Sequence, residues 1–168
     1  PQLVLAYLVI AGRSVARDEV ADVLWGDDLS DHWPGALRGV LSKIRAVLDR
    51  ASFDGAALRS EDTSIRLDLA VSSDLDVAEA TLAAGEATFE SGDHGQALAA
   101  GEDAAAALSP RFLPHDDGEW TERQRYRIES LARRAAQLQV RALLALHRPG
   151  DAADLAHRYT EQHPFDEG

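Results

Sequence analysis

The strongest chemical signal in the sequence is a group of basic side chains within residues 34–50. Its polar and charged members are Arg38, Ser42, Lys43, Arg45, Asp49 and Arg50. Arg38, Ser42, Arg45 and Asp49 are spaced four, three and four residues apart, so they are expected to share one exposed face of a helix, with Lys43 and Arg50 beside it. With four basic residues and one acidic residue, the stretch has a net charge of +3. Arg and Lys on such a face can bind guanine edges and phosphates of double-stranded DNA. A helix face that simply meets water is the alternative.

Residues 57–69 carry a second basic pair on a predicted β-hairpin. Apolar residues alternate with polar ones after a polar turn, SEDTS, and this period of two is typical of short strands joined by a tight turn. Arg59 and Arg66 would then contact DNA phosphates. Glu61 and Asp62 lie at the tip, where their carboxylates would repel a phosphate.

Three predicted helices precede the hairpin, at residues 2–10, 17–24 and 34–50. The third has apolar residues at the helical period: Leu37, Val40, Leu41, Ile44, Val47 and Leu48. Three short helices and a hairpin predict a winged helix-turn-helix over residues 1–70, in which the last helix enters the major groove. Arg17, at the start of the second helix, completes the set of candidate DNA contacts.

Residues 71–168 are predicted to be helical throughout, with helices at 75–91, 94–108, 119–146 and 151–163. In the second helix of each pair, a small residue precedes a proline. Ala97 lies 13 residues before Pro110, and Ala152 lies 12 residues before Pro164. This pattern is typical of tetratricopeptide-like packing, with a generic helical bundle as the alternative. The predicted fold class is therefore mainly α, a winged helix-turn-helix followed by a tetratricopeptide-like helical domain.

The segment between the helix pairs, residues 109–118, is predicted to be irregular and to pack onto the helical bundle through Phe112 and Leu113. We interpret Trp120 and Tyr126 as core anchors, with a protein-contact patch as the alternative. The arginines of the following helix are interleaved with glutamates, which predicts ion pairs at i,i+4 spacing on an exposed face. These arginines are Arg123, Arg125, Arg127, Arg133 and Arg134.

The charge of the chain is unevenly distributed. The 168 residues include 17 basic and 29 acidic side chains, a net charge of −12. Residues 1–69 contribute −3, from 8 basic and 11 acidic residues, and residues 70–168 contribute −9, from 9 and 18. The acidity belongs mainly to the second part, so the net charge does not exclude nucleic acid as a partner of the basic helix.

No motif for catalysis, metal binding or cofactor binding stands out. The chain has no Cys, which excludes disulfides and thiolate chemistry and makes the cytoplasm the expected location. The histidines do not have the spacing of the H-E-x-x-H motif, and there is no glycine-rich nucleotide loop or G-x-S-x-G motif. The apolar run LVLAYLVI is too short to span a bilayer. We therefore expect no enzyme activity, no cofactor and no membrane partner.

Six segments occur in a characteristic order: GRSVARDEVADVLWG, ALRGVLSKIRAVL, LRSEDTSIRLDL, DLDVAEATLAAGEATFESGDHGQAL, FLPHDDGEWTERQRYRIESL and EQHPFDE. Together they resemble the Streptomyces antibiotic regulatory protein family and, more broadly, regulators with a bacterial transcriptional activation domain. The resemblance implies a response-regulator-type winged helix fused to a tetratricopeptide-like activation domain that binds direct-repeat promoter sites and contacts RNA polymerase. It also implies that the third helix recognises the groove through Arg38, Ser42, Lys43 and Arg45. Because the family has a small sheet before the first helix, we expect this chain, which starts at Pro1, to be part of a longer protein.

Two features depart from the family pattern. Ala16 stands where the family usually has Ser or Thr, whose hydroxyl would cap the second helix. The hairpin has an acidic tip and keeps only the last two residues of the family's Gly-Tyr-Arg-Leu ending. The prediction is a DNA-binding transcriptional activator that pairs as a homodimer on DNA. The alternative is a protein-interaction or sensory module whose winged helix has lost DNA binding.

Overall fold

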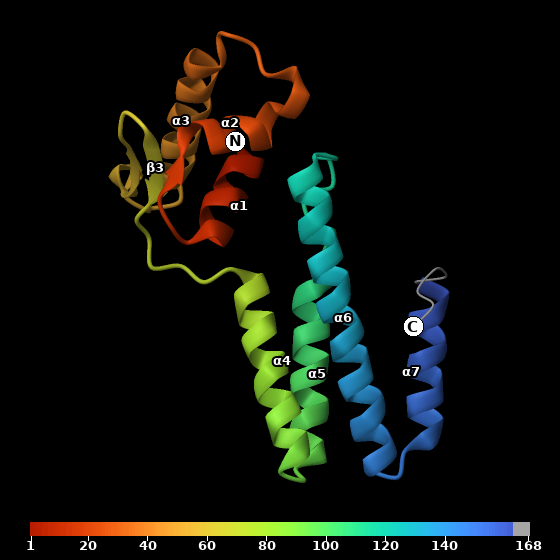
Figure 1. The fold of residues 1–168 in the computed structure, drawn as a ribbon. Coiled ribbons are helices and arrows are strands. Elements are labelled where there is room, and N and C mark those ends of the chain that lie inside the picture. Colours follow the sequence, from red (N-terminus) through yellow and green to blue (C-terminus); the bar gives the residue numbers. More distant parts are fainter. Residues whose placement is uncertain (163–168) are drawn as a thin grey trace. The chain divides into compact units, whose positions relative to one another are not determined.

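The computed structural model describes residues 1–162 and is mainly helical (Figure 1). The backbone separates into two compact units. The first comprises Pro1–Ser73 and Phe112–Arg123, and the second comprises Asp74–Arg111 and the residues from Gln124 onward. The predicted end of the last helix at His163, the proline of the second predicted repeat, Pro164, and the rest of the EQHPFDE segment lie outside the described residues.

The first unit consists of three helices and a small antiparallel sheet. In chain order its elements are α1 (Gln2–Ala11), β1 (Val15–Ala16), α2 (Arg17–Trp25), α3 (Trp33–Arg50), β2 (Leu58–Ser60) and β3 (Ser64–Leu67). The predicted helices and hairpin strands are therefore confirmed. The two-residue strand β1 was not predicted. It pairs with β3, so the sheet order is β1-β3-β2.

The core of the first unit is built from α1, α2, α3 and the inner face of the sheet. Leu37, Leu41 and Ile44 of α3 are at most 1% exposed, as the apolar stripe of this helix predicts. They belong to the same apolar cluster as Leu58 of β2 and Ile65 of β3. Because side chains alternate along a strand, the residues between these buried positions lie on the outer face of the sheet.

The segment Phe112–Arg123 belongs to the first unit, so the prediction that it packs onto the helical bundle is wrong. Phe112 and Leu113 pack against the apolar cluster of the first unit, and Trp120 is a buried member of that cluster. The rings of Trp120 and Tyr7 are nearly perpendicular at a centroid distance of 5.3 Å, and the ring of Phe112 lies 5.8 Å from that of Trp120. Aromatic pairs in edge-to-face arrangements stabilise a contact beyond the area they bury.

The second unit contains α4 (Asp74–Glu90), α5 (His94–Leu108), most of α6 (Glu119–Ala145) and α7 (Pro149–Gln162). Two glycines allow the close approach of its helices. A Cβ at Gly85 would lie 2.7 Å from the Cβ of Ala100, and a Cβ at Gly101 would lie 2.8 Å from Cγ of Gln139. Tyr126 is 72% exposed, so its prediction as a core anchor is wrong.

Three arginines of α6 form ion pairs with glutamates of α4. The pairs are Arg127 with Glu79, Arg134 with Glu86 and Arg141 with Glu90. The arginines recur every seven residues, which returns each to the same side of the helix after about two turns. The i,i+4 prediction is confirmed for Arg123, which pairs with Glu119 at 2.6 Å, but it is wrong for Arg127 and Arg134.

No helix within residues 1–162 has both the length and the apolar character needed to cross a membrane.

Candidate nucleic-acid interface

The exposed side of α3 carries the polar residues that are free to bind a ligand. Arg38, Ser42 and Lys43 are all exposed. Among the residues that the structure describes, none of these three has a hydrogen-bond or ion-pair partner. Two cations and a hydroxyl therefore face solvent from one helix, and the buried leucines on its opposite side hold that helix in place.

Arg45 and Arg50 of α3 differ from these residues because each bonds to backbone. Arg45 is half-buried rather than exposed, and its Nη2 donates to the carbonyl of Leu58 in β2 at 3.1 Å. Arg45 therefore lies on the same helix face as Arg38, as the spacing predicts, but is only partly exposed. Arg50 donates from Nε to the carbonyl of Ala46 at 3.1 Å, within its own helix. Thus Arg45 joins α3 to the hairpin.

Helix α2 begins at the hairpin without a side-chain cap. Ala16 occupies the N-cap position in an extended conformation and offers no side-chain hydrogen bond, as the sequence predicts. The amide of Arg17 instead donates to the carbonyl of Thr63 at 3.0 Å. The guanidinium of Arg17 donates to Oγ of Ser60 at 2.8 Å and to the carbonyl of Glu61 at 3.3 Å. Arg17 thereby joins α2 to the hairpin next to its tip.

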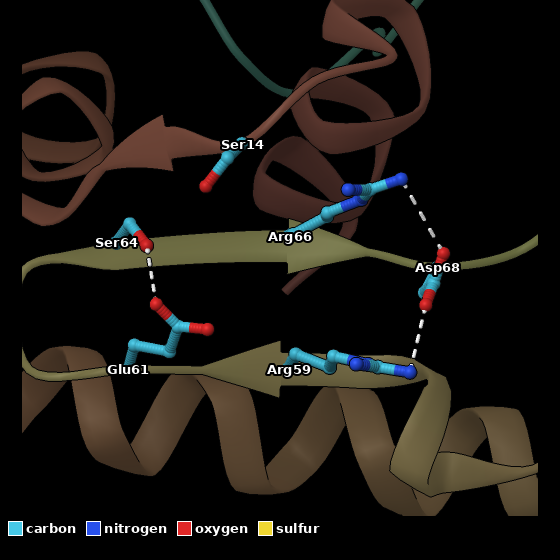
Figure 2. Close-up of a pocket in the computed structure, with 6 residues that line it drawn as sticks. All are labelled: Ser14, Arg59, Glu61, Ser64, Arg66 and Asp68. Atoms are coloured by element: carbon cyan, nitrogen blue, oxygen red, sulfur yellow. Dashed lines mark hydrogen bonds and ion pairs between the residues drawn. The ribbon is translucent and has the colours of Figure 1, made fainter.

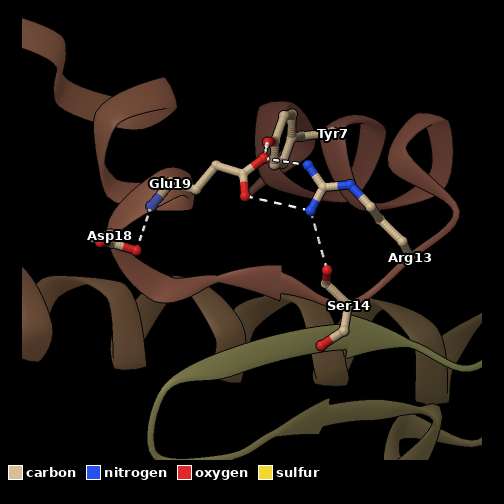
Figure 3. A network of polar contacts seen from close by, with 5 residues as sticks. All are labelled: Tyr7, Arg13, Ser14, Asp18 and Glu19. Carbon is tan, nitrogen blue, oxygen red and sulfur yellow. Dashed lines mark hydrogen bonds and ion pairs between the residues drawn. The ribbon is translucent and has the colours of Figure 1, made fainter.

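The first turn of α2 is also tied to α1 (Figure 3). The hydroxyl of Tyr7 donates to Oε1 of Glu19, and Nη2 of Arg13 lies 2.6 Å from the same oxygen. Burial, followed by the bond to Glu19, raises the pKa of Tyr7 to about 12. The Arg13 guanidinium, followed by the Tyr7 hydroxyl, holds the pKa of Glu19 below its ordinary value. Glu19 is therefore ionised at neutral pH.

The two hairpin arginines lie on the outer face of the sheet, opposite each other in the β2–β3 ladder (Figure 2). Asp68 pairs with both, at 3.0 Å from Arg59 and 3.5 Å from Arg66. Like charges directly opposite on a sheet destabilise it, and the shared carboxylate offsets that repulsion. Glu61, also on this face, accepts a hydrogen bond from Oγ of Ser64 at 3.5 Å. Together with Ser14, these residues line a hollow of about 150 Å³.

The candidate residues thus fall into three groups. Arg38, Ser42 and Lys43 are free on α3. Arg17, Arg45 and Arg50 donate to backbone carbonyls, the first two in the hairpin and Arg50 in its own helix. Arg59 and Arg66 both form ion pairs with Asp68. All three lie on the outer face of the sheet, which points away from the apolar core. Helical periodicity could identify the free group. The hairpin contacts join residues far apart in the sequence, and no local pattern indicates them.

The family to which the chain belongs is shown by comparison with family models. The model described as bacterial transcriptional activator domain matches residues 73–168, more than half of the chain. A search of curated proteins gives no match. The match confirms the resemblance found in the sequence. The chain belongs to the bacterial transcriptional activator domain family, whose members are regulators of transcription.

Proposed function

We propose that this chain is a DNA-binding transcriptional activator whose residues 1–70 form a winged helix-turn-helix domain. The observation that carries the proposal is the pair of unpartnered cations, Arg38 and Lys43, on the exposed side of α3. A cation without an internal partner can neutralise a phosphate or donate to a guanine edge without first breaking a protein contact. Family membership supports the same function.

In this proposal, α3 lies in the major groove of promoter DNA. Arg38, Ser42 and Lys43 contact base edges and phosphates there. Arg17, Arg45, Arg50, Arg59 and Arg66 make phosphate contacts with the N–H groups that their protein partners leave unused. Each guanidinium has five N–H donors, so one internal bond leaves others available.

The helical residues 71–168 act as a tetratricopeptide-like activation domain that contacts RNA polymerase or a second copy of the chain. Tyr126, at 72% exposed, is an aromatic side chain of the kind enriched where proteins bind one another. Two copies on direct promoter repeats form a homodimer on DNA, and the second binding event gains from a raised effective concentration. The site of action is the cytoplasm, where the bacterial promoter lies.

The proposal is tested with the duplex that the chain enriches from a randomised pool, by gel shift over a series of salt concentrations. We expect Arg38→Ala with Lys43→Ala to weaken binding and to reduce the salt slope by about 1 for each phosphate that the variant no longer neutralises. The matched control, Arg134→Ala with Arg141→Ala, removes two cations from the second unit and leaves both quantities unchanged. Failure of the wild-type chain to enrich any duplex, or equal binding by both double variants, would overturn the proposal.

A protein-interaction module is the second candidate, and the charges of the hairpin favour it. Glu61 and Asp62 place carboxylates at the tip, and Asp68 occupies both outer-face arginines. If this candidate is correct, the gel shift shows no salt-dependent binding of the chain to any duplex. The substitution Asp68→Asn discriminates between the two, since freeing Arg59 and Arg66 strengthens DNA binding only where the hairpin contacts phosphates.

A further inference from the structure

Gly39 occupies the centre of the exposed side of α3. At 3.6 residues per turn, it lies about 160–200° from the buried Leu37, Leu41 and Leu48, directly away from the core. On the same scale, Ser42 and Lys43 lie about 60° and 40° to either side of it, and Arg38 about 100° away. The free polar residues of α3 therefore surround Gly39.

The fold itself gives no reason for a glycine at this position. Gly39 does not have the positive φ that favours glycine, and no heavy atom lies within 4 Å of the place where a Cβ would be. It is the seventh residue of an 18-residue helix, where glycine is among the least favourable residues. Alanine would fit the isolated chain and would stabilise the helix.

Three glycines in or at the end of helices have an evident internal role, whereas Gly35 of α3 and Gly150 of α7 resemble Gly39 in having none. Gly85 and Gly101 allow helices to approach so closely that a Cβ would lie under 3.0 Å from a neighbouring side chain. Gly12 ends α1 with a φ of 59°, a conformation that other residues rarely adopt. Gly39 shares neither feature, so any requirement for a missing side chain there comes from a molecule outside the chain.

We propose that Gly39 is a specificity-determining residue at which the backbone of α3 lies directly against base edges in the major groove. The inference rests on the proposed DNA-binding function and names the point of closest approach. A polyanion is the partner that the surroundings favour, because the free side chains beside Gly39 include two cations and no carboxylate. The major groove is about 12 Å wide, close to the diameter of a helix with its side chains, so a glycine on the leading side lets the helix sit deeper.

A deeper position of α3 also brings the side chains beside Gly39 within reach of the walls of the groove. Arg38 and Lys43 project to either side of Gly39 and can contact groups on the walls of the groove while the backbone meets its floor. A methyl group at position 39 would hold the helix away from the bases. The distances from Arg38, Ser42 and Lys43 to the base edges would then all increase. The loss therefore falls on sequence-specific binding rather than on attraction to phosphates.

The test compares Gly39→Ala with Gly150→Ala in the full chain. Gly150, in α7, likewise has no heavy atom within 4 Å of the place where a Cβ would be, but it belongs to the second unit, which contributes no residue to the proposed interface. The probes are the duplex enriched by the wild-type chain and an unrelated duplex of the same length. We expect Gly39→Ala to lower affinity for the enriched duplex about tenfold or more. Affinity for the unrelated duplex stays within about twofold, and the melting temperature does not fall.

The outcomes separate this inference from the proposed function. The inference is supported if Gly39→Ala lowers the affinity for the enriched duplex alone, and Gly150→Ala changes the affinity for neither duplex. Unchanged binding by Gly39→Ala overturns it, and the proposed function still stands if Arg38→Ala with Lys43→Ala weakens binding. Equal losses for both glycine variants also overturn it, because the effect would then not belong to the interface. If the wild-type chain enriches no duplex, both proposals fail.

Discussion

Helices α3 and α6 carry the same kinds of charged residue but use them differently. On α6, Arg127, Arg134 and Arg141 each pair with a glutamate of α4. On α3, Arg38 and Lys43 have no partner among the described residues. A basic residue count would not distinguish these helices, whereas the pairing of each side chain does.

The difference shows what each set of charges contributes. The pairs between α4 and α6 are about half exposed, so each contributes little to stability, but together they favour one register of the two helices. The free cations of α3 contribute no such contact within the chain and keep their full capacity to bind an anion. The net charge of −12 for the whole chain therefore indicates neither the ion pairs of α6 nor the free cations of α3.

The largest expected effect concerns what holds α3 in place. Leu41 is 1% exposed in the core, and Leu41→Ala is expected to lower the free energy of unfolding by about 3 kcal/mol through reduced burial and a cavity. Arg38→Ala, on the exposed side, is expected to change it by less than about 0.5 kcal/mol. Chemical denaturation of both variants measures the contrast. A decrease of similar size for Arg38→Ala would mean that this cation has a structural role and that the comparison with α6 is invalid.

An effect of intermediate size on stability is expected at the contact of Tyr7 and Arg13 with Glu19 in the first unit. Tyr7→Phe removes the hydroxyl bond to Glu19 and is expected to cost about 1 kcal/mol, since Arg13 still pairs with the carboxylate. Folding raises the pKa of Tyr7 from 10.0 to about 12, so the native state keeps this proton more tightly than the unfolded chain does. The stabilisation is complete below pH 10 and is lost as pH rises from 10 to 12.

Ultraviolet absorbance titration of tyrosinate tests this second prediction. The wild-type chain should show an ionisation step near pH 12 that Tyr7→Phe lacks. The difference in stability between the two proteins should shrink above pH 10. An unchanged titration curve for Tyr7→Phe would show that the bond to Glu19 does not retain the proton.

The smallest expected effect belongs to the ion pairs of α6. In a double-mutant cycle of Arg134→Ala and Glu86→Ala, we expect a coupling energy of about 0.5 kcal/mol that decreases with added salt. A control cycle with Arg38→Ala and Glu86→Ala should give no coupling, because Arg38 has no ion-pair partner among the described residues. A coupling energy of zero for Arg134 with Glu86 would show that ion pairing does not make the cations of α6 energetically different from those of α3.

Local periodicity was sufficient to predict most elements of the fold. The apolar stripe of α3 and the alternation in β2 and β3 identified both the elements and their buried faces, since these patterns depend only on neighbouring residues. The free residues Arg38, Ser42 and Lys43 could be predicted for the same reason, because the side of a helix opposite its apolar stripe meets solvent.

Features that depend on distant residues could not be predicted. Residues 112–123 look like a linker of the helical region, yet Trp120 packs with Tyr7 of α1. Arg127 has no glutamate three or four residues away in its own helix, and it pairs with Glu79 of α4. Arg45 resembles any exposed cation until the carbonyl of Leu58 is placed beside it. In each case the partner is set by tertiary packing, which no local spacing encodes.

The start of α2 has a consequence for how the first unit opens and folds. Since the amide of Arg17 donates to the carbonyl of Thr63, its exchange with solvent deuterium requires the hairpin to detach from the helix. The protection of this one amide therefore reports the opening of the contact between α2 and the hairpin. The same bond joins residues 46 positions apart, so its formation closes a long loop, and we expect it to form late in the folding of this unit.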